Sequence, residues 1–443
     1  MARLTYYNGK GINLDDIINS DLFREHDESI MICDLTDIVV KYYLWKTLMP
    51  KVTPFYAVKC NDSYPVLKIL NELKVGFDCA SMDEIDKVLS LGCSPDRIIY
   101  AHPCKLVSHL KYAKDMNVYT MTFDSNYELY KIRTYYPDAS LVLRFRCDAK
   151  KALCPLGKKF GCDPYTEAPK LMQLAKKLNL NIVGVSFHVG SDCLDYPIYE
   201  EAIKQSRKLV DLGNSLGFNM KVVDIGGGFP GEHNSNFIES SQVVNAALDK
   251  YFPNSDEILL MAEPGRFFVC SSTIVLCKIH SMKEILDDNG NIEEIWYYLS
   301  DGAYGTFNQV LTYKDIYPVF PKLWSKNKNT SKTKLYKTLI WGPTCDSMDI
   351  INKDIYLPKL DIGDPLIYPD LGAYVLPFRS RFNGFEISRV EYFINKLFKI
   401  ENNNMQDKMR PCENLGHKTS CTIQSQGEKI SGFSDTRNKL YSV

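Results

Sequence analysis

The strongest constraint on the fold is an alternation of short apolar runs with longer amphipathic stretches between residues 54 and 264. The apolar runs predict eight β-strands, at residues 55–58, 75–79, 97–101, 118–123, 141–145, 182–188, 221–225 and 258–262. The stretches between them have helical spacing, for example at residues 81–91, 167–178 and 199–216. Continuously apolar strands separated by helices are typical of a parallel sheet covered by helices. Eight such units in about 210 residues favour an α/β fold, a (β/α)8 barrel, over an open doubly wound sheet, which stays an alternative.

The pattern changes after Arg266. Further strands linked by loops are predicted at residues 272–280, 295–300, 338–341, 364–368 and 388–393, and a polar loop at 325–334. They predict an all-β domain, a sandwich or barrel, to which the first 35 residues add strands. The predicted organisation is an N-terminal segment (1–35), a barrel (36–268), a β domain (269–400) and a weakly ordered polar tail (401–443).

The composition is that of an ordinary globular protein. Lys and Arg number 53 and Asp and Glu 54, so the net charge is −1, and nothing indicates nucleic acid or an anionic membrane as partner. No apolar run approaches the about 20 residues that span a bilayer, and the first residues lack the apolar core of a signal peptide. The 14 cysteines form no CxxC pair, which favours reduced thiols and a cytoplasmic location.

Residues able to do chemistry follow the predicted strands. In a (β/α)8 barrel the active site lies at the carboxyl ends of the strands. The candidate residues there are Lys59, Asp78, Arg144, His188, Gly226, Gly227, Gly228 and Glu263, with Arg266 just beyond. One end of the barrel, its mouth, would thus carry an amine, an imidazole, carboxylates and a glycine turn. This grouping predicts an active site at the mouth.

Each of these residues also has a plainer interpretation. Lys59 follows an apolar strand, so it is expected to have a depressed pKa and to act as a nucleophile, but it can also leave the rim for water. The glycines can cradle a phosphate, with Arg266 adding a charge-assisted bond, or can simply form a tight turn. His188 can be a general base, a metal ligand or a flat surface for a ring; without a cluster at metal-ligand spacing we expect no metal.

Together these residues fit pyridoxal phosphate as cofactor. Lys59 would hold the aldehyde as an imine, the glycine turn would hold the phosphate, and Glu263 would pair with the ring nitrogen. A carboxylate in that place keeps the ring protonated, so the cofactor stays a strong electron sink, as decarboxylation requires.

Long motifs carry a family resemblance. They are residues 54–62 (PFYAVKCND), 76–81 (GFDCAS), 184–191 (GVSFHVGS), 224–231 (DIGGGFPG), 262–266 (AEPGR) and 341–346 (WGPTCD). On these motifs the chain resembles the eukaryotic ornithine decarboxylases, group IV pyridoxal-phosphate decarboxylases of the alanine-racemase-like fold, over about residues 30–395. Residues 154–161 (CPLGKKFG) resemble the insect members most.

The resemblance implies a role for individual residues. Lys59 is implied to be the Schiff-base lysine, His188 to stack on the cofactor ring and Glu263 to bind the ring nitrogen. The implied phosphate ligands are Ser191, Gly228, Arg266 and Tyr374, and the residues implied to support the cofactor site or a dimer contact are Asp78, Glu84, Arg144 and Lys159.

A second group of residues is implied to come from a partner subunit. Cys345 is implied to return a proton to the α-carbon, and Asp346 to meet the distal ammonium of the substrate, with Tyr304 as a further substrate contact. In the family the residues matching Cys345 and Asp346 reach into the partner's barrel, so each active site lies at a homodimer interface. Taken alone, Cys345 would more often be a buried structural thiol.

Several positions depart from the family pattern. Where the family has an aspartate for the distal amine, this chain has Tyr313, and Asp315 comes two residues later. Either Asp315 shifts into place, or the diamino acid binds weakly, or the substrate differs. Asp192 stands where a glycine is usual, and its carboxylate would repel a phosphate unless it turns to solvent. Arg379 and Arg381 replace small or apolar residues, and we expect solvated surface charges there.

The resemblance implies an active homodimeric enzyme that converts L-ornithine to putrescine and CO2 in polyamine biosynthesis. One alternative is a related decarboxylase with a changed substrate preference. Another is a non-catalytic, antizyme-inhibitor-like binding protein, although such homologues lose residues that this chain keeps. Residues 105–137 resemble the family's antizyme-binding segment, which makes antizyme a candidate partner.

Overall fold

The computed structural model describes residues 4–9, 11–147, 152–154, 157, 159–233, 235–253, 257–312, 318–324 and 334–398. Eight parallel strands close into a barrel in the order β11-β12-β3-β4-β5-β6-β7-β9. Their bounds are Thr53–Ala57 (β3), Gly76–Cys79 (β4), Ile98–Tyr100 (β5), Thr120–Phe123 (β6), Ser140–Arg144 (β7), Asn181–Ser186 (β9), Val222–Asp224 (β11) and Leu259–Ala262 (β12). The predicted barrel is confirmed, and the open doubly wound sheet is wrong.

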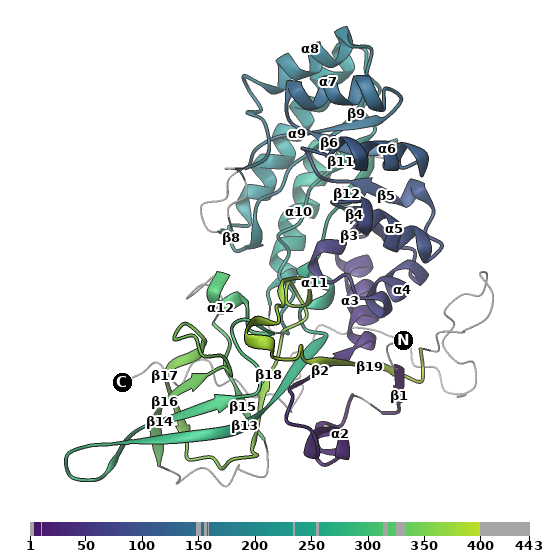
Figure 1. Cartoon of the computed structure of the whole chain (residues 1–443). Coiled ribbons are helices and arrows are strands. Elements are labelled where there is room, and N and C mark those ends of the chain that lie inside the picture. The colour runs from purple at the N-terminus through teal and green to yellow at the C-terminus, as the bar shows by residue number, and fades with distance from the viewer. Residues whose placement is uncertain are drawn as a thin grey trace. The chain divides into compact units, whose positions relative to one another are not determined.

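Helices cover the outside of this barrel (Figure 1). They are Leu35–Leu48 (α3), Tyr64–Glu72 (α4), Met82–Ser90 (α5), Val107–Asp115 (α6), Asn126–Tyr135 (α7), Ala168–Lys177 (α8), Pro197–Ser215 (α9), Phe237–Tyr251 (α10) and the short Arg266–Val269 (α11). On α5, for example, Ile85 and Val88 are the residues that are buried against the barrel, whereas all four residues of α11 are buried. Inside the barrel, the space between the strands is filled by Phe55, Ile99, Val142 and Met261.

The remaining strands form a mixed sheet in the order β1-β19-β2-β13-β14-β16-β17, with β18 paired to β13 and β15. Their bounds are Leu4–Tyr7 (β1), Ile30–Asp34 (β2), Thr273–Leu286 (β13), Ile292–Leu299 (β14), Lys322–Leu323 (β15), Leu335–Trp341 (β16), Ile350–Pro358 (β17), Pro365–Tyr368 (β18) and Arg389–Asn395 (β19). Three short helices accompany it, Leu14–Ile18 (α1), Asp21–Arg24 (α2) and Gln309–Thr312 (α12). A separate pair joins Ala152–Cys154 (β8) to Ser191–Cys193 (β10).

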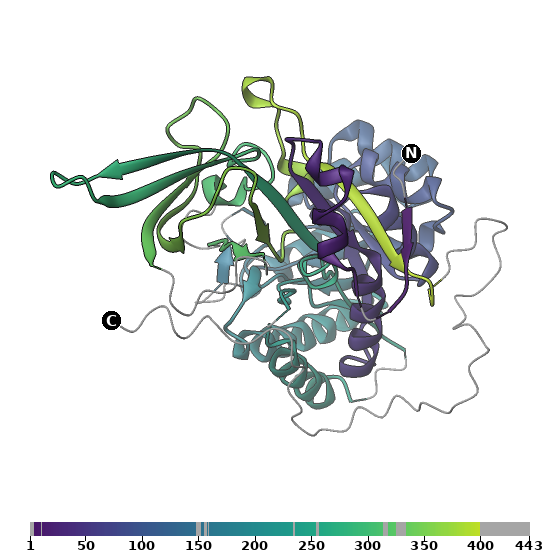
Figure 2. The same ribbon diagram turned by 90° about the horizontal axis from the view of Figure 1, so that it is seen from below.

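Two strands from the first 34 residues, β1 and β2, belong to this sheet. β2 pairs with β13 on one side and with β19 on the other, and β1 pairs with β19. Figure 2 shows the yellow-green β19 running beside the purple N-terminal strands. The sheet also contains β17, which the sequence pattern did not predict.

An aromatic cluster fixes the segments that follow the last barrel strands. Trp45 of α3 is fully buried, and its ring centroid lies 5.1 Å from that of Phe229 and 5.3 Å from that of Phe267. The buried Phe237 at the start of α10 packs on the same group, 4.2 Å from Phe267 between centroids. Burying each such ring contributes about 1.5–3 kcal/mol. The cluster therefore holds α11, and with it Arg266, against the loop after the glycine turn.

Two sequence predictions fall outside the described residues: most of the polar loop at 325–334 and the tail at 401–443. The domain boundaries also stay predictions. Within the part of the chain that the structure describes, no helix combines the length and apolarity needed to cross a membrane.

Candidate active site at the barrel mouth

The carboxyl ends of the barrel strands bring most of the predicted cofactor residues together. Lys59 lies in the 3-10 turn Val58–Cys60 that follows β3, and Arg144 ends β7. His188 follows β9, and Glu263 follows β12. Because all the barrel strands run parallel, these side chains share one mouth, as predicted.

The segment after β4 shows how local sequence places a site residue. Asp78 lies in the buried strand β4. After this strand, Ser81 caps α5 by accepting a hydrogen bond from Glu84 N at 3.2 Å. The Glu84 carboxylate accepts one from Ala80 N at 2.6 Å, so cap and first turn are tied reciprocally. This arrangement fixes the exit of β4 and holds Asp78 in the mouth.

The Lys59 ammonium forms an ion pair with Asp78. Burial alone would lower the pKa of Lys59, but the negative charges of Asp78 and Glu263 outweigh it and raise that pKa above its usual value. The predicted depressed pKa is therefore wrong, because desolvation was weighed without these carboxylates. The Lys59 side chain is still 40% exposed, which leaves it open to a ligand.

A buried group of carboxyls lies beneath Lys59. Burial raises the pKa of Asp224 to about 7. A hydrogen bond of 2.9 Å that its Oδ1 accepts from Gly226 N acts in the opposite direction and lowers this pKa. Burial, with Asp224 and Asp78 as like-charged neighbours, raises the pKa of Glu263 well above its usual range. Asp224 was not predicted as a site residue, although it opens the motif at 224–231 and ends a barrel strand. A cation placed against Glu263 would relieve this repulsion.

His188 is a neutral ring in this setting. Burial lowers the pKa of His188 well below its usual value, and the charges of Arg144 and Lys59 lower it further. Its Nδ1 accepts a hydrogen bond of 3.0 Å from Gly190 N, so the ring proton resides on Nε2. A neutral, oriented imidazole suits stacking on a flat ring.

The glycine turn brings backbone close to these residues. A Cβ on Gly227 would lie 2.9 Å from His188 Nε2 and 2.8 Å from Glu263 O, and one on Gly228 would lie 2.6 Å from Gly190 O. Gly228 also has a φ of +100°, a region that favours glycine. Only glycines let the backbone approach in this way, which keeps N–H groups available at the mouth.

Tyr374 and Arg266 lie beside this turn. The guanidinium of Arg266 is 5.5 Å from the Tyr374 ring centroid, and Tyr374 N donates to Cys60 O at 2.8 Å. Tyr374 has a φ of +58°, a strained backbone conformation for a residue other than glycine. Ser191 starts β10, one residue after Gly190.

The mouth fits pyridoxal phosphate. Asp78 Oδ1 and Glu263 Oε1 are buried, and no described residue donates a hydrogen bond to either atom. A cationic ring nitrogen would satisfy a buried carboxylate of this kind. Lys59 supplies the amine, His188 the flat ring, and the glycine turn with Arg266 supplies donors for a phosphate.

The predicted substrate residues lie elsewhere, in the mixed sheet. Cys345 and Asp346 occupy the turn between β16 and β17, where Cys345 N donates to Asn383 Oδ1 at 3.0 Å and Asp346 accepts from the hydroxyl of Tyr304. No hydrogen bond or ion pair found among the described residues links them to the barrel mouth. Cys345 is exposed, so the alternative of a buried structural thiol is wrong.

A buried carboxylate sets the conformation of this turn. Asp349 is fully buried, and its Oδ2 accepts hydrogen bonds from Thr344 N at 2.9 Å and Thr344 Oγ1 at 2.7 Å. Its Oδ1 accepts one from Ala303 N at 2.7 Å, next to Tyr304. Asp349 therefore presents Cys345, Asp346 and Tyr304 as one unit.

The departures from the family pattern have different outcomes. Tyr313 and Asp315 lie outside the described residues. Asp192 lies in β10 with a φ of +48°. Arg381 is exposed and pairs with Glu386, as expected for a surface charge. Arg379 is not a solvated surface charge, because it is partly buried and its Nη1 donates to Ser388 O at 2.7 Å.

Comparison with known proteins identifies relatives of one kind. Ornithine decarboxylase 2 of Drosophila melanogaster is 44% identical over 391 residues, which cover 88% of this chain and 98% of that protein. Antizyme inhibitor 2 of Xenopus laevis is 41% identical over 387 residues, covering 86% and 84%. The solved arginine decarboxylase of Paramecium bursaria Chlorella virus, bound to agmatine, has a TM-score of 0.80 and 34% identity, covering 86% of this chain and 99% of that one.

The family model agrees with this likeness. Residues 35–270, more than half of the chain, match the pyridoxal-binding domain of pyridoxal-dependent decarboxylases. The resemblance to eukaryotic ornithine decarboxylases predicted from the motifs is confirmed, since relatives of that name are 40–44% identical over most of the chain. The chain therefore belongs to the family of pyridoxal-dependent decarboxylases, and its cofactor is pyridoxal 5′-phosphate.

Proposed function

We propose that this chain removes CO2 from L-ornithine and forms putrescine, a step of polyamine biosynthesis. The observation that carries the proposal is the barrel mouth itself, where Lys59, Asp78 and Glu263 lie together with the neutral His188. Support for the substrate comes from relatives named ornithine decarboxylase in Drosophila melanogaster, Caenorhabditis elegans and Rattus norvegicus.

Each residue has a proposed part in the reaction. Bound pyridoxal phosphate supplies the electron sink for the negative charge left when CO2 departs. Lys59 would hold the cofactor covalently, and the Glu263 carboxyl would face its ring nitrogen, whose positive charge would favour the ionised form of this buried group. Cys345 returns a proton to the α-carbon, and Asp346 receives the distal ammonium of the substrate.

A panel of amino acids tests the substrate. We expect kcat/KM for CO2 release to be at least about tenfold higher with L-ornithine than with L-lysine, because one methylene discriminates about 10–200-fold. L-Arginine should also react more slowly, because its guanidinium is larger than the distal ammonium of ornithine. The variant Asp346→Asn should raise KM for ornithine about tenfold or more, since it loses a charge-assisted contact worth about 1.5–3 kcal/mol. A preference for another amino acid would instead support the changed-substrate alternative, which Tyr313 suggests.

The non-catalytic alternative has some support, because antizyme inhibitor 2 is among the relatives. The chain retains Lys59, Glu263 and Cys345, the residues that are proposed to carry out the decarboxylation, which disfavours this alternative. Purified protein that carries the cofactor and releases no CO2 from any amino acid of the panel would favour it over the enzyme.

We also propose a homodimer with shared active sites. The turn that carries Cys345 is bordered by exposed apolar side chains, and Phe382 packs 4.6 Å from Tyr304 between ring centroids. The exposed fraction is 60% for Met348 and 42% for Phe385. An exposed apolar group around polar residues of the proposed reaction marks a surface that a second chain covers.

Antizyme is a proposed partner at residues 105–137. Large aromatic side chains on and near α7 are exposed: Tyr127 at 80%, Tyr119 at 48% and Tyr130 at 47%. We expect Tyr127→Asp to weaken binding of purified antizyme at least about tenfold, as expected for loss of an aromatic anchor. The matched variant Ile238→Asp, at an exposed position on α10, should bind like the wild type. No association of wild-type protein with antizyme would remove the proposal.

A cytoplasmic location is proposed as well. Eleven cysteines are free thiols, several of them buried, as reducing compartments allow. Fractionation of cells that express the protein checks this location, and recovery in a secretory compartment would contradict it.

A further inference from the structure

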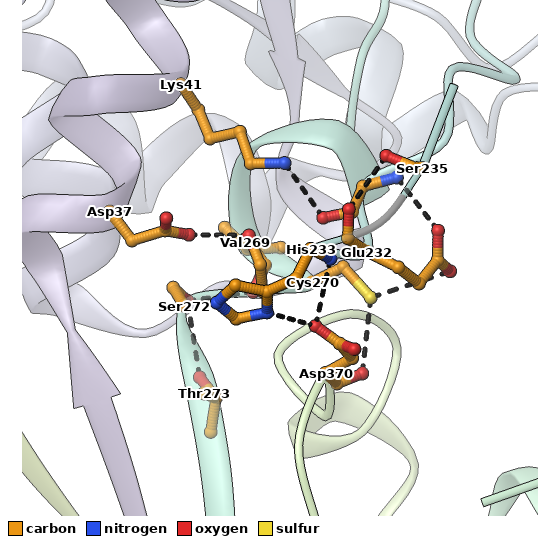
Figure 3. A network of polar contacts seen from close by, with 12 residues as sticks. Asp37, Lys41, Glu232, His233, Ser235, Val269, Cys270, Ser272, Thr273 and Asp370 are labelled. Carbon is orange, nitrogen blue, oxygen red and sulfur yellow. Dashed lines mark hydrogen bonds and ion pairs between the residues drawn. The ribbon is translucent and has the colours of Figure 1, made fainter. Parts of the chain in front are cut away.

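A polar network joins three segments beside the glycine turn (Figure 3). They are residues 231–235, which follow the turn; α11 with Cys270; and residues 370–374, which lead to Tyr374. Gly231 lies so close to α11 that a Cβ there would be 2.1 Å from Arg266 O. Gly372 N donates to Cys270 O at 3.0 Å, which ties the third segment to the second.

His233 and Asp370 connect the first segment to the third. His233 Nδ1 lies 2.7 Å from Asp370 Oδ1, and His233 N donates to the same oxygen at 3.3 Å. The two residues are 137 positions apart in the chain, and the Asp370 side chain is only 17% exposed against 60% for His233. Figure 3 shows the imidazole pointing at the carboxylate from the opposite loop.

The interior of the network reaches the phosphate-site arginine. Glu232, the neighbour of His233, places its Oε1 3.8 Å from Arg266 Nη1 and accepts from the Cys270 thiol at 3.8 Å. The thiol of Cys270 has one proton, which it can donate instead to Asp370 O, the nearer acceptor at 3.2 Å. A shift of the 231–235 loop would therefore move a charge that faces Arg266.

We propose that His233 and Asp370 are positioning residues for the cofactor phosphate, which they hold by clamping the glycine-turn loop to the Tyr374 segment. The inference rests on the proposed assignment of Gly228, Arg266 and Tyr374 to the phosphate. Neither His233 nor Asp370 is proposed to touch the cofactor. They act through Glu232, Arg266 and the two loops.

The charges around the pair give it a pH dependence. The hydrogen bond and charge of Asp370 raise the pKa of His233, with Asp37 of α3 adding to this and Lys41 opposing it. Burial alone would raise the pKa of Asp370, but His233 lowers it below the usual value, and Lys322 acts in the same sense. The ionic pair thus exists between these two pKa values. The stabilisation that the protonated His233 gives to the contact between the two loops is full at pH values below the ordinary histidine pKa. It is lost as pH rises through the raised pKa of His233.

Dissociation of pyridoxal phosphate from the full-length holoprotein tests the clamp. After dilution at about pH 6, we expect His233→Ala to lose the cofactor about three- to fivefold faster than wild type, the range for a partly exposed ion pair. At about pH 9 the difference between the two rates should shrink, because deprotonation of His233 removes the ion pair and leaves only its hydrogen bond to Asp370. Asp370→Asn keeps an acceptor oxygen but no charge, so it should lose cofactor at an intermediate rate that does not change between the two pH values.

Two comparisons make the test specific. Reloading with pyridoxal, which lacks the phosphate, should give equal affinities for wild type and both variants. Lys250→Ala removes an exposed ion pair of 2.9 Å to Glu200 between α9 and α10, and should match wild type throughout. Thermal unfolding checks that the variants stay folded.

Each result decides the proposal. Wild-type rates in both variants at both pH values would overturn it, as would an equal loss of affinity for pyridoxal, since the pair would then not act on the phosphate. Wild type that binds pyridoxal as tightly as pyridoxal phosphate would overturn the underlying phosphate assignment. Holoprotein that releases no CO2 from ornithine would contradict the proposed function but leave this test intact.

Discussion

Lys59→Ala is expected to lower kcat/KM for CO2 release at least about 10³-fold, the scale on which removal of a covalent catalytic group acts. The amine is the only part of this side chain that can attach the cofactor. Its loss also removes the positive charge that faces Asp78 and Glu263, which raises the pKa of Glu263 further. CO2 release and the visible absorbance of the cofactor measure both effects.

The variant Lys59→Arg separates two roles of Lys59, the covalent attachment of the cofactor and the positive charge that faces Asp78. A guanidinium keeps the ion pair with Asp78 but is not a nucleophile at neutral pH, so this variant should be as inactive as Lys59→Ala while unfolding like the wild type. Reductive trapping followed by peptide mass mapping should place the cofactor on Lys59 in the wild type alone. Activity within tenfold of wild type in Lys59→Ala would contradict the assignment.

Mixing inactive variants is expected to restore activity. Cys345→Ala should lower kcat about 10²-fold or more, as loss of a proton donor does. If each site takes Lys59 from one subunit and Cys345 from the other, an equal mixture of Lys59→Ala and Cys345→Ala dimers, exchanged to equilibrium, regains about a quarter of wild-type activity. Half of those dimers are mixed, and each holds one complete site.

A second mixture serves as the matched control. Cys345→Ala and Asp346→Ala alter the same turn, so no mixed dimer of these two has a complete site and activity should stay low. Recovery in this control, or none in the first mixture, would contradict shared sites. Size-exclusion chromatography establishes whether the chains associate at all.

The barrel could be predicted because its strands are apolar along their whole length. β3, β4 and β12 each place nearly every residue in the buried interior, so periodicity marks them clearly. β17 was missed because three polar residues, Asn352, Lys353 and Asp354, interrupt its apolar pattern, and the last two of them are exposed. A strand covered on one face only, with a bulge in its pairing to β16, leaves little trace in the sequence.

The residues of the candidate site could be predicted from the sequence, but their pKa shifts could not. Strand-end position alone indicated Lys59 and Glu263. The raised pKa of Lys59 depends on a carboxylate 19 residues away, and only the closed barrel brings Asp78 to it. Asp224 was overlooked because its role comes from sharing a buried space with Glu263, which no local pattern encodes.

The pairing of β2 has a consequence for synthesis on the ribosome. β2 is made within the first 34 residues, yet its neighbours β13 and β19 begin only at Thr273 and Arg389. The barrel strands are complete by Ala262, so the barrel can form while β2 still has both edges unpaired. A chain cut short before β19 would keep one edge of β2 open to pairing with other chains. Once β19 has been made, its pairing with β2 closes this edge, so full-length chains no longer offer it to one another.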